Sequence, residues 1–251
     1  MIATFIALVF AHVVADYVLQ PGWMVERKRN PLILLLHGLV ILVVTHAAVG
    51  HFDARAVISL AVMHVCIDAA KVYGFADTLA AHLLDQVAHI LAIIFVTFHA
   101  PDLWQTGSWN AQTDWLLHVM LLVAGAILAT RAGSFALKKL MQPFSADFAS
   151  GGLPNGGNLI GILERGLIYV LILSGQAAGV GFLIAAKSIL RFEVATKQKA
   201  AEYVIVGTLA SFGWAILIAT ATDLLLSTLP ALVIGDVVAY FNGVTSTKGT
   251  S

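Results

Sequence analysis

Two histidine–aspartate pairs stand close together in an otherwise apolar part of the sequence, His64 with Asp68 and Asp85 with His89. Each pair has a spacing of four residues. Residues four apart lie on one face of a helix, about 6 Å apart along its axis, so each pair can offer two donor atoms to one ion. Imidazole nitrogens and carboxylate oxygens are donors that zinc, manganese and iron all accept. The pairs therefore predict a metal site between two neighbouring helices.

The same spacing occurs earlier in the chain, at His12 and Asp16, and His37 lies in the next apolar segment. Counting ~1.5 Å per residue from the nearest cytoplasmic helix end, we expect all these side chains to lie in one layer on that side of the membrane. Asp16 or Asp85 could also act as a general base. Five other histidines fall outside this layer or these pairs and are expected to be structural: His46, His51, His82, His99 and His118. The predicted metal ligands are His12, Asp16, His37, His64, Asp68, Asp85 and His89.

The composition indicates a membrane protein. The chain of 251 residues is 59% hydrophobic and 11% charged, whereas a soluble domain carries about 25% charged residues. Its mean hydropathy is +0.90. The formal net charge is zero, so overall charge gives no reason to expect nucleic acid as a partner. We predict an all-α, polytopic transmembrane helical bundle of about eight spans.

The apolar segments are grouped into two regions. Residues 1–135 form a predicted membrane domain of about five spans that carries the His/Asp motifs, and residues 136–158 form a Gly-rich cytoplasmic linker. Residues 159–251 form a second membrane region of about three spans, in which 229–241 is too short to cross and a polar tail follows. The expected spans are 1–20, 32–49, 56–74, 79–98, 115–133, 159–173, 177–192 and 203–226.

The basic residues predict the orientation. If the turn at 27–29 lies in the cytoplasm, alternating spans place most lysines and arginines on that side, as the positive-inside rule requires. The loop 99–114 then lies outside, and it contains neither lysine nor arginine. Both termini are therefore expected on the periplasmic side.

Four cations are candidates for binding an anionic substrate. Lys71 follows Asp68 by three residues, and Lys187 and Arg191 are four apart in the second region, where Arg165 also lies. A lysine at a helix end can equally extend to the lipid headgroups, and Glu164 can neutralise Arg165. The predicted substrate-binding residues are Lys71, Arg165, Lys187 and Arg191.

The ordered motifs resemble a family of bacterial integral membrane proteins classified as a domain of unknown function. The resemblance rests on His12-x3-Asp16 with Leu19-Gln20, on His37, on His64-x3-Asp68 and on Asp85-Gln86-x2-His89. More distantly, the chain is similar to membrane-bound metal-dependent hydrolases of the bacterial inner membrane. The resemblance implies a multi-pass protein of the inner membrane whose site is formed by these motifs.

Three functions remain open from the sequence. A metal-dependent hydrolase would bind one or two divalent ions and cleave a phosphate- or acyl-containing substrate, small or lipid-like, next to the bilayer. A transporter would use the same layer to pass metal ions or protons. A structural membrane protein would use the layer only as a hydrogen-bonded network between helices. The metal's identity and the oligomeric state are not specified by the sequence.

Overall fold

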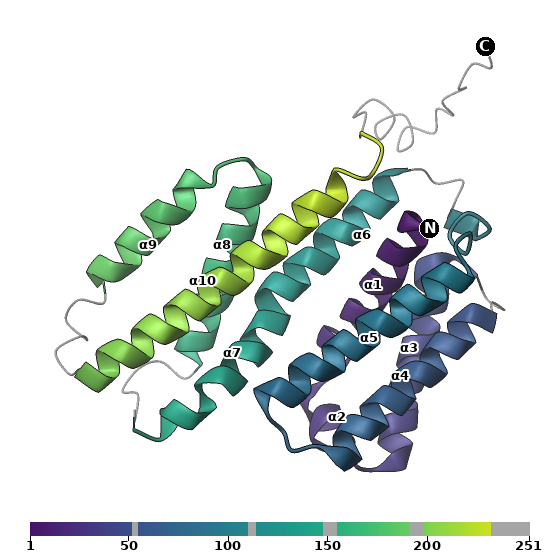
Figure 1. The fold of residues 1–251 in the computed structure, drawn as a ribbon, viewed down its shortest axis with the longest axis horizontal. Coiled ribbons are helices and arrows are strands. Elements are labelled where there is room, and N and C mark those ends of the chain that lie inside the picture. The colour runs from purple at the N-terminus through teal and green to yellow at the C-terminus, as the bar shows by residue number, and fades with distance from the viewer. Residues whose placement is uncertain (52–54, 110–113, 148–154, 191–197, 232–251) are drawn as a thin grey trace.

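The computed structural model describes residues 1–51, 55–109, 114–147, 155–190 and 198–231, and every regular element in these ranges is a helix (Figure 1). Six helical segments are long and apolar enough to cross a membrane, and two shorter apolar helices accompany them. The chain is therefore an all-α, multi-pass membrane protein, as predicted. The α-helices are α1 (Ile2–Tyr17), α2 (Gly22–Glu26), α3 (Pro31–Val49), α4 (Arg55–Gly74), α5 (Leu79–His99), α6 (Asp114–Ile127), α7 (Gly133–Met141), α8 (Gly156–Leu173), α9 (Ala178–Leu190) and α10 (Gln198–Leu226).

The long helices run alternately up and down the bundle. The start of α1 and the end of α10 lie at the same end of the molecule, and the short α2 lies at the opposite end (Figure 1). Within the first half, α1 packs against α3, α5 and α6, while α4 packs between α3 and α5. Taking α6 and α7 as one, the described helices comprise six that are long enough to cross a membrane and two shorter apolar ones, α1 and α9, against about eight predicted spans.

Local capping determines where the helices that carry the motifs begin. The side chain of Asn30 accepts a hydrogen bond from the Leu32 amide at 2.9 Å, and Pro31 occupies the first turn of α3. Thr78 accepts from the Ala81 amide at 3.1 Å and starts α5. Because a capped first turn has a defined start, the positions of His37 along α3 and of Asp85 along α5 follow from these caps.

The fifth span is longer than the predicted 115–133. After α6 the chain forms a π-helical segment, Leu128–Ala132, and continues as α7 to Met141, so that α7 takes up the first residues of the predicted linker. No proline interrupts this stretch before Pro143, and the helix therefore persists past the apolar residues. At its end, Lys139 hydrogen-bonds Asp77 in the loop before α5 and lowers the pKa of that exposed carboxyl.

The π-helical segment joins the two halves of the molecule. Its wide turn leaves backbone carbonyls able to accept bonds from later helices: Trp214 of α10 donates to the Leu128 carbonyl at 2.9 Å, and Arg165 of α8 donates to the Thr130 carbonyl at 3.0 Å. Helix α10 packs against α6, α7 and α8. Residues 148–154 of the predicted linker, and the chain from 232 onward with most of the segment 229–241 and the polar tail, lie outside the described residues.

The interior of the first half has an apolar part and a polar part. Ile6, Leu8, Val57 and Ile93 are at most 1% exposed and belong to one cluster. The polar part lies toward the end of the bundle where α2 is found. Large apolar side chains such as Leu32 face outward and are exposed, which is the arrangement expected of a protein surrounded by lipid.

Candidate metal centre

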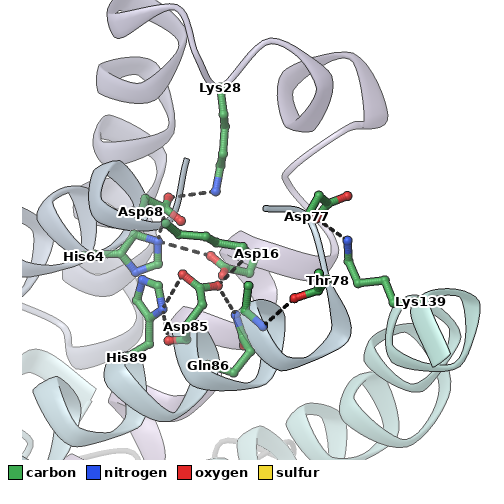
Figure 2. A network of polar contacts seen from close by, with 12 residues as sticks. Asp16, Lys28, His64, Asp68, Asp77, Thr78, Asp85, Gln86, His89 and Lys139 are labelled. Carbon is green, nitrogen blue, oxygen red and sulfur yellow. Dashed lines mark hydrogen bonds and ion pairs between the residues drawn. The ribbon is translucent and has the colours of Figure 1, made fainter. Parts of the chain in front are cut away.

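All seven predicted ligands come together where α1, α3, α4 and α5 meet. Figure 2 shows Asp16, His64, Asp68, Asp85 and His89 pointing toward one another from three of these helices. Three overlapping triads each offer ligand atoms that lie within 4.8 Å of one another. The triads are His12–Asp16–His64, His37–His64–Asp68 and Asp68–Asp85–His89. The spacing of four residues has thus placed each pair on an inward face.

Four of the ligand atoms lie close to one another. The Nε2 atoms of His37 and His64 are 3.1 Å apart, and they lie 3.3 and 3.4 Å from Oδ1 of Asp16. Each also lies 3.6 Å from Oδ2 of Asp68. A tetrahedral ion with ligands at about 2.0 to 2.1 Å requires ligand atoms about 3.3 to 3.4 Å apart. The five distances therefore allow a small ion such as zinc to contact three of these atoms at once.

Several buried ligand atoms have no hydrogen-bond partner. They are found on both carboxylates and imidazoles: Asp16 Oδ1, Asp85 Oδ1, His12 Nδ1, His37 Nδ1 and His89 Nε2. Buried polar atoms are normally satisfied, and leaving one without a partner costs more in a membrane than at a wet surface. A bound cation would satisfy those atoms that present a lone pair.

Two lysines approach the layer from the α2 end. Nζ of Lys28 lies 2.7 Å from Oδ2 of Asp68, and Nζ of Lys71 lies 2.8 Å from Oδ2 of Asp85. Lys71 was predicted as a substrate-binding residue, and it contacts this carboxylate. Sequence reasoning missed Lys28, because its place in the basic turn 27–29 is explained by the positive-inside rule and its partner is 40 residues away.

Gln86 links two of the ligands, a role that sequence reasoning did not assign although the residue stands in the quoted motif. Its Nε2 donates to Oδ2 of Asp85 at 3.2 Å, and its Oε1 lies 3.4 Å from Nε2 of His12. One turn further along α5, Nδ1 of His89 donates to the backbone carbonyl of Asp85 at 2.8 Å. Contacts of this kind orient a ligand and choose which ring nitrogen carries the proton.

On the side of the layer away from α2, the packing is apolar and tight. A cavity of about 10 Å³ touches His12, His64 and His89, and its remaining wall includes Leu8 and Ile93. That volume is about the minimum for one water molecule. Among the residues that the structure describes here, the polar layer therefore ends at the hydrophobic cluster.

The candidate cations of the second region lie elsewhere. Arg165 is 3% exposed and donates to the Thr130 carbonyl, to Ser211 at 3.1 Å and to Ser134 at 2.5 Å. Lys187 pairs with Glu164 at 2.5 Å, so the glutamate neutralises this lysine directly. These contacts are made within α7, α8, α9, α10 and the π-helical segment, and not with the seven ligand candidates. Arg191 lies outside the described residues.

A large open cavity adjoins these cations. It measures about 840 Å³, and its lining includes Arg165 and Lys187, the further cations Arg131 and Lys138, and Tyr17 at the end of α1. Since Tyr17 directly follows Asp16, the cavity begins beside the helix end that carries one of the metal-ligand candidates.

Comparison with known families gives a match within the first half of the chain. Residues 4–117 match the family model "Protein of unknown function (DUF3307)". The match runs from α1 to the start of α6, so it includes all seven ligand candidates and Lys28, Lys71 and Gln86, but not Arg165 or Lys187. Searches among curated proteins and among solved structures gave no match.

Proposed function

We propose that the protein is a membrane-embedded, metal-dependent hydrolase of the bacterial inner membrane, with a His/Asp centre that opens to the cytoplasmic face. The observation that carries the proposal is the set of four atoms from Asp16, His37, His64 and Asp68, with spacings of 3.1 to 3.6 Å. Two imidazoles and two carboxylates at these distances can hydrogen-bond one another, and the same spacing suits ligands of one small ion.

Hydrolysis is the chemistry that such a centre supports best. Asp16, His37, His64 and Asp68 would hold a divalent ion, which would supply Lewis-acid chemistry by polarising the scissile group and lowering the pKa of water toward ~7. In the reaction, the water oxygen bonds to the phosphorus or acyl carbon, the bond to the leaving oxygen breaks, and that oxygen takes a proton. Lys28 and Lys71 lie at the α2 end of the layer, where their charge would attract an anionic substrate. Asp85 keeps one free oxygen, Oδ1, which can accept a proton or bind a cation.

The residues that line the large cavity suggest the chemical class of the substrate. Among its described lining residues, four cations face one anion, Glu164, and the remaining wall contains apolar side chains such as Phe135. Positive charge beside apolar surface at the cytoplasmic leaflet suits an amphiphilic anion. We therefore propose an anionic lipid or small molecule as substrate, with Arg165, Lys187 and Arg191 as the residues that hold its charged group.

A transporter receives less support. A path for ions must continue across the bilayer through polar groups or water. Here the described part of the layer meets Leu8, Leu60 and Ile93 around a cavity of about 10 Å³. This packing favours a site that substrates enter and leave on one side.

Metal analysis of the protein purified in mild detergent tests the proposal. We expect the wild type to retain zinc, manganese or iron, and both His64→Ala and Asp68→Ala to lose most of it. His99→Ala is the matched control, because His99 is exposed and bonds only within its own helix, to the Phe95 carbonyl at 2.9 Å. Equal metal content in the wild type and all three variants would contradict the metal centre.

A second measurement separates hydrolysis from transport. The purified protein is assayed with phosphate and carboxylic esters, and the same preparation in sealed vesicles is assayed for metal-ion flux. Hydrolysis without flux, lost in Asp68→Ala, is the expected result. Flux without hydrolysis, lost in the same variant, would replace the hydrolase with a transporter.

A further inference from the structure

When the set of four atoms is taken out of the layer, four buried ligand atoms without a partner remain: one is Nδ1 of His37, which belongs to that set's own residue, and three belong to other residues. These three are Nδ1 of His12, Oδ1 of Asp85 and Nε2 of His89, and none has a hydrogen-bond partner. The three residues are 5%, 6% and 2% exposed. Each atom can bind a cation only if it presents a lone pair and carries no hydrogen. The neighbouring groups show which of these atoms are protonated.

The tautomer of His12 follows from Gln86. Oδ2 of Asp85 is an acceptor, so the Gln86 group that lies 3.2 Å from it must be the NH2. The amide oxygen of Gln86 then faces Nε2 of His12 at 3.4 Å. Since that oxygen only accepts, Nε2 is the protonated nitrogen, and Nδ1 presents a lone pair.

The tautomer of His89 follows from its own helix. Its Nδ1 lies 2.8 Å from the backbone carbonyl of Asp85, which only accepts, so Nδ1 carries the proton and Nε2 presents a lone pair. The third atom, Oδ1 of Asp85, is an acceptor as well, because Lys71 and Gln86 already occupy the other oxygen of that carboxylate. Three acceptors therefore lie in one buried layer without a partner that donates to them.

Asp68, Asp85 and His89 lie close enough to share an ion, and the ring of His12 stacks beside them. The rings of His12 and His89 stack with centroids 5.0 Å apart, and ligand atoms of Asp68, Asp85 and His89 lie within 4.8 Å of one another. Asp68 also belongs to the set of four atoms, so its carboxylate can bridge two ions. In two-metal hydrolytic sites the ions lie about 3.5 to 4 Å apart, a separation that one bridging carboxylate spans.

We infer that the layer binds a second divalent cation through His12, Asp85 and His89, with Asp68 bridging it to the first. The inference rests on the proposed function and assigns Asp85 as a ligand in place of a general base. Gln86 is a positioning residue, since it holds His12 in the tautomer that presents Nδ1.

The net charge of the layer limits the chemical class of the substrate. The three carboxylates and the ammonium groups of Lys28 and Lys71 leave one net negative charge, with the histidines neutral. Two divalent ions turn this into three net positive charges in a region that excludes water. A phosphomonoester dianion with one hydroxide balances that charge, whereas a neutral carboxylic ester does not. The second ion therefore makes a phosphoester the expected substrate class.

Metal stoichiometry after reconstitution with Mn²⁺ tests the inference. We expect two ions per chain in the wild type and in His99→Ala, one in His89→Ala, and a second site 10- to 100-fold weaker in Gln86→Ala, the usual cost of losing such an orienting contact. One ion in the wild type, kept in His89→Ala and lost in His64→Ala, would overturn the second site and leave the metal centre standing. No ion in the wild type would remove both.

Electron paramagnetic resonance of the Mn²⁺-loaded wild type gives a readout that needs no variant. Two ions bridged by Asp68 should give an exchange-coupled spectrum, and inorganic phosphate should change it. An isolated six-line signal would overturn the dinuclear centre. A coupled spectrum that phosphate leaves unchanged would overturn the phosphoester assignment alone.

Discussion

Two lysine residues stabilise the buried carboxylates of the layer inside the bilayer. An unpaired charge at the centre of a membrane helix costs about 2.5 to 3.5 kcal/mol on insertion scales. Asp68 and Asp85 each have a lysine within 2.8 Å, so neither carboxylate is buried alone. The protein without metal therefore depends on its two lysines, and the metal-bound protein depends on them less.

Replacing Lys28 by alanine should expose this dependence. The Asp68 carboxylate would lose its partner at 2.7 Å while remaining 1% exposed, and removing one member of a buried ion pair typically costs about 3 to 5 kcal/mol. We expect a marked fall in the thermal unfolding temperature in detergent after chelation, and a smaller fall with metal present.

The control is Lys139→Ala, which removes a lysine whose partner, the Asp77 side chain, is 81% exposed. Exposed pairs contribute about 0 to 1 kcal/mol, so this variant should unfold near the wild-type temperature. If Lys28→Ala behaved like the control in the chelated protein, the buried pair would not have the role assigned to it.

At the level of helices, small residues bring the second half against the first. A Cβ atom on Gly133 would lie 2.8 Å from Cδ1 of Trp214 and 2.9 Å from Nε of Arg165. The glycine thus makes room for the two side chains that bond to the π-helical segment. Close helix contacts at small residues are the usual way membrane helices associate.

Gly133→Ala should therefore destabilise the molecule. Forcing a methyl group into a packed interface costs about 1 to 3 kcal/mol, and here it would displace an indole and a buried guanidinium. Gly181→Ala in α9 is the matched control, since a Cβ there meets nothing within 4 Å. Unfolding temperatures in detergent should fall for Gly133→Ala only. An equal change in the two variants would show that close packing at Gly133 does not contribute to stability.

The sequence predicted the features that depend on the helical period and on runs of apolar residues. Spacing four placed His64 and Asp68 on one inward face, and hydropathy found α3, α4 and α5 to within one or two residues. It could not predict that α6 passes into α7, because a π-helical turn has no composition of its own. Nor could it find Lys28 as the partner of Asp68, since that contact depends on how α2 folds back under α4.

At the scale of the whole molecule, the orientation of the helices in the membrane is the prediction that remains. The turn 27–29, the loop at Asp77 and the end of α7 lie at one end of the bundle, while Gly50 and Ser108 meet at the other. If the basic end faces the cytoplasm, the metal layer opens there too.

Single-cysteine labelling tests this orientation. The chain has one cysteine, Cys66, which a Cys66→Ser background removes. In intact spheroplasts an impermeant thiol reagent should label Gln105→Cys, and it should label Ala76→Cys only after permeabilisation. Both positions are exposed. The opposite pattern would reverse the protein in the membrane, and labelling of both from outside would contradict the alternating topology.

The π-helical segment also has a consequence for how the protein is made. Its carbonyls at Leu128 and Thr130 accept bonds from Trp214 and Arg165, which leave the ribosome later. The first five spans can enter the bilayer and assemble the His/Asp layer, but these two donors have their acceptors only once α8 and α10 have inserted. The fifth span thus gains these two hydrogen bonds only after the last helices are in place.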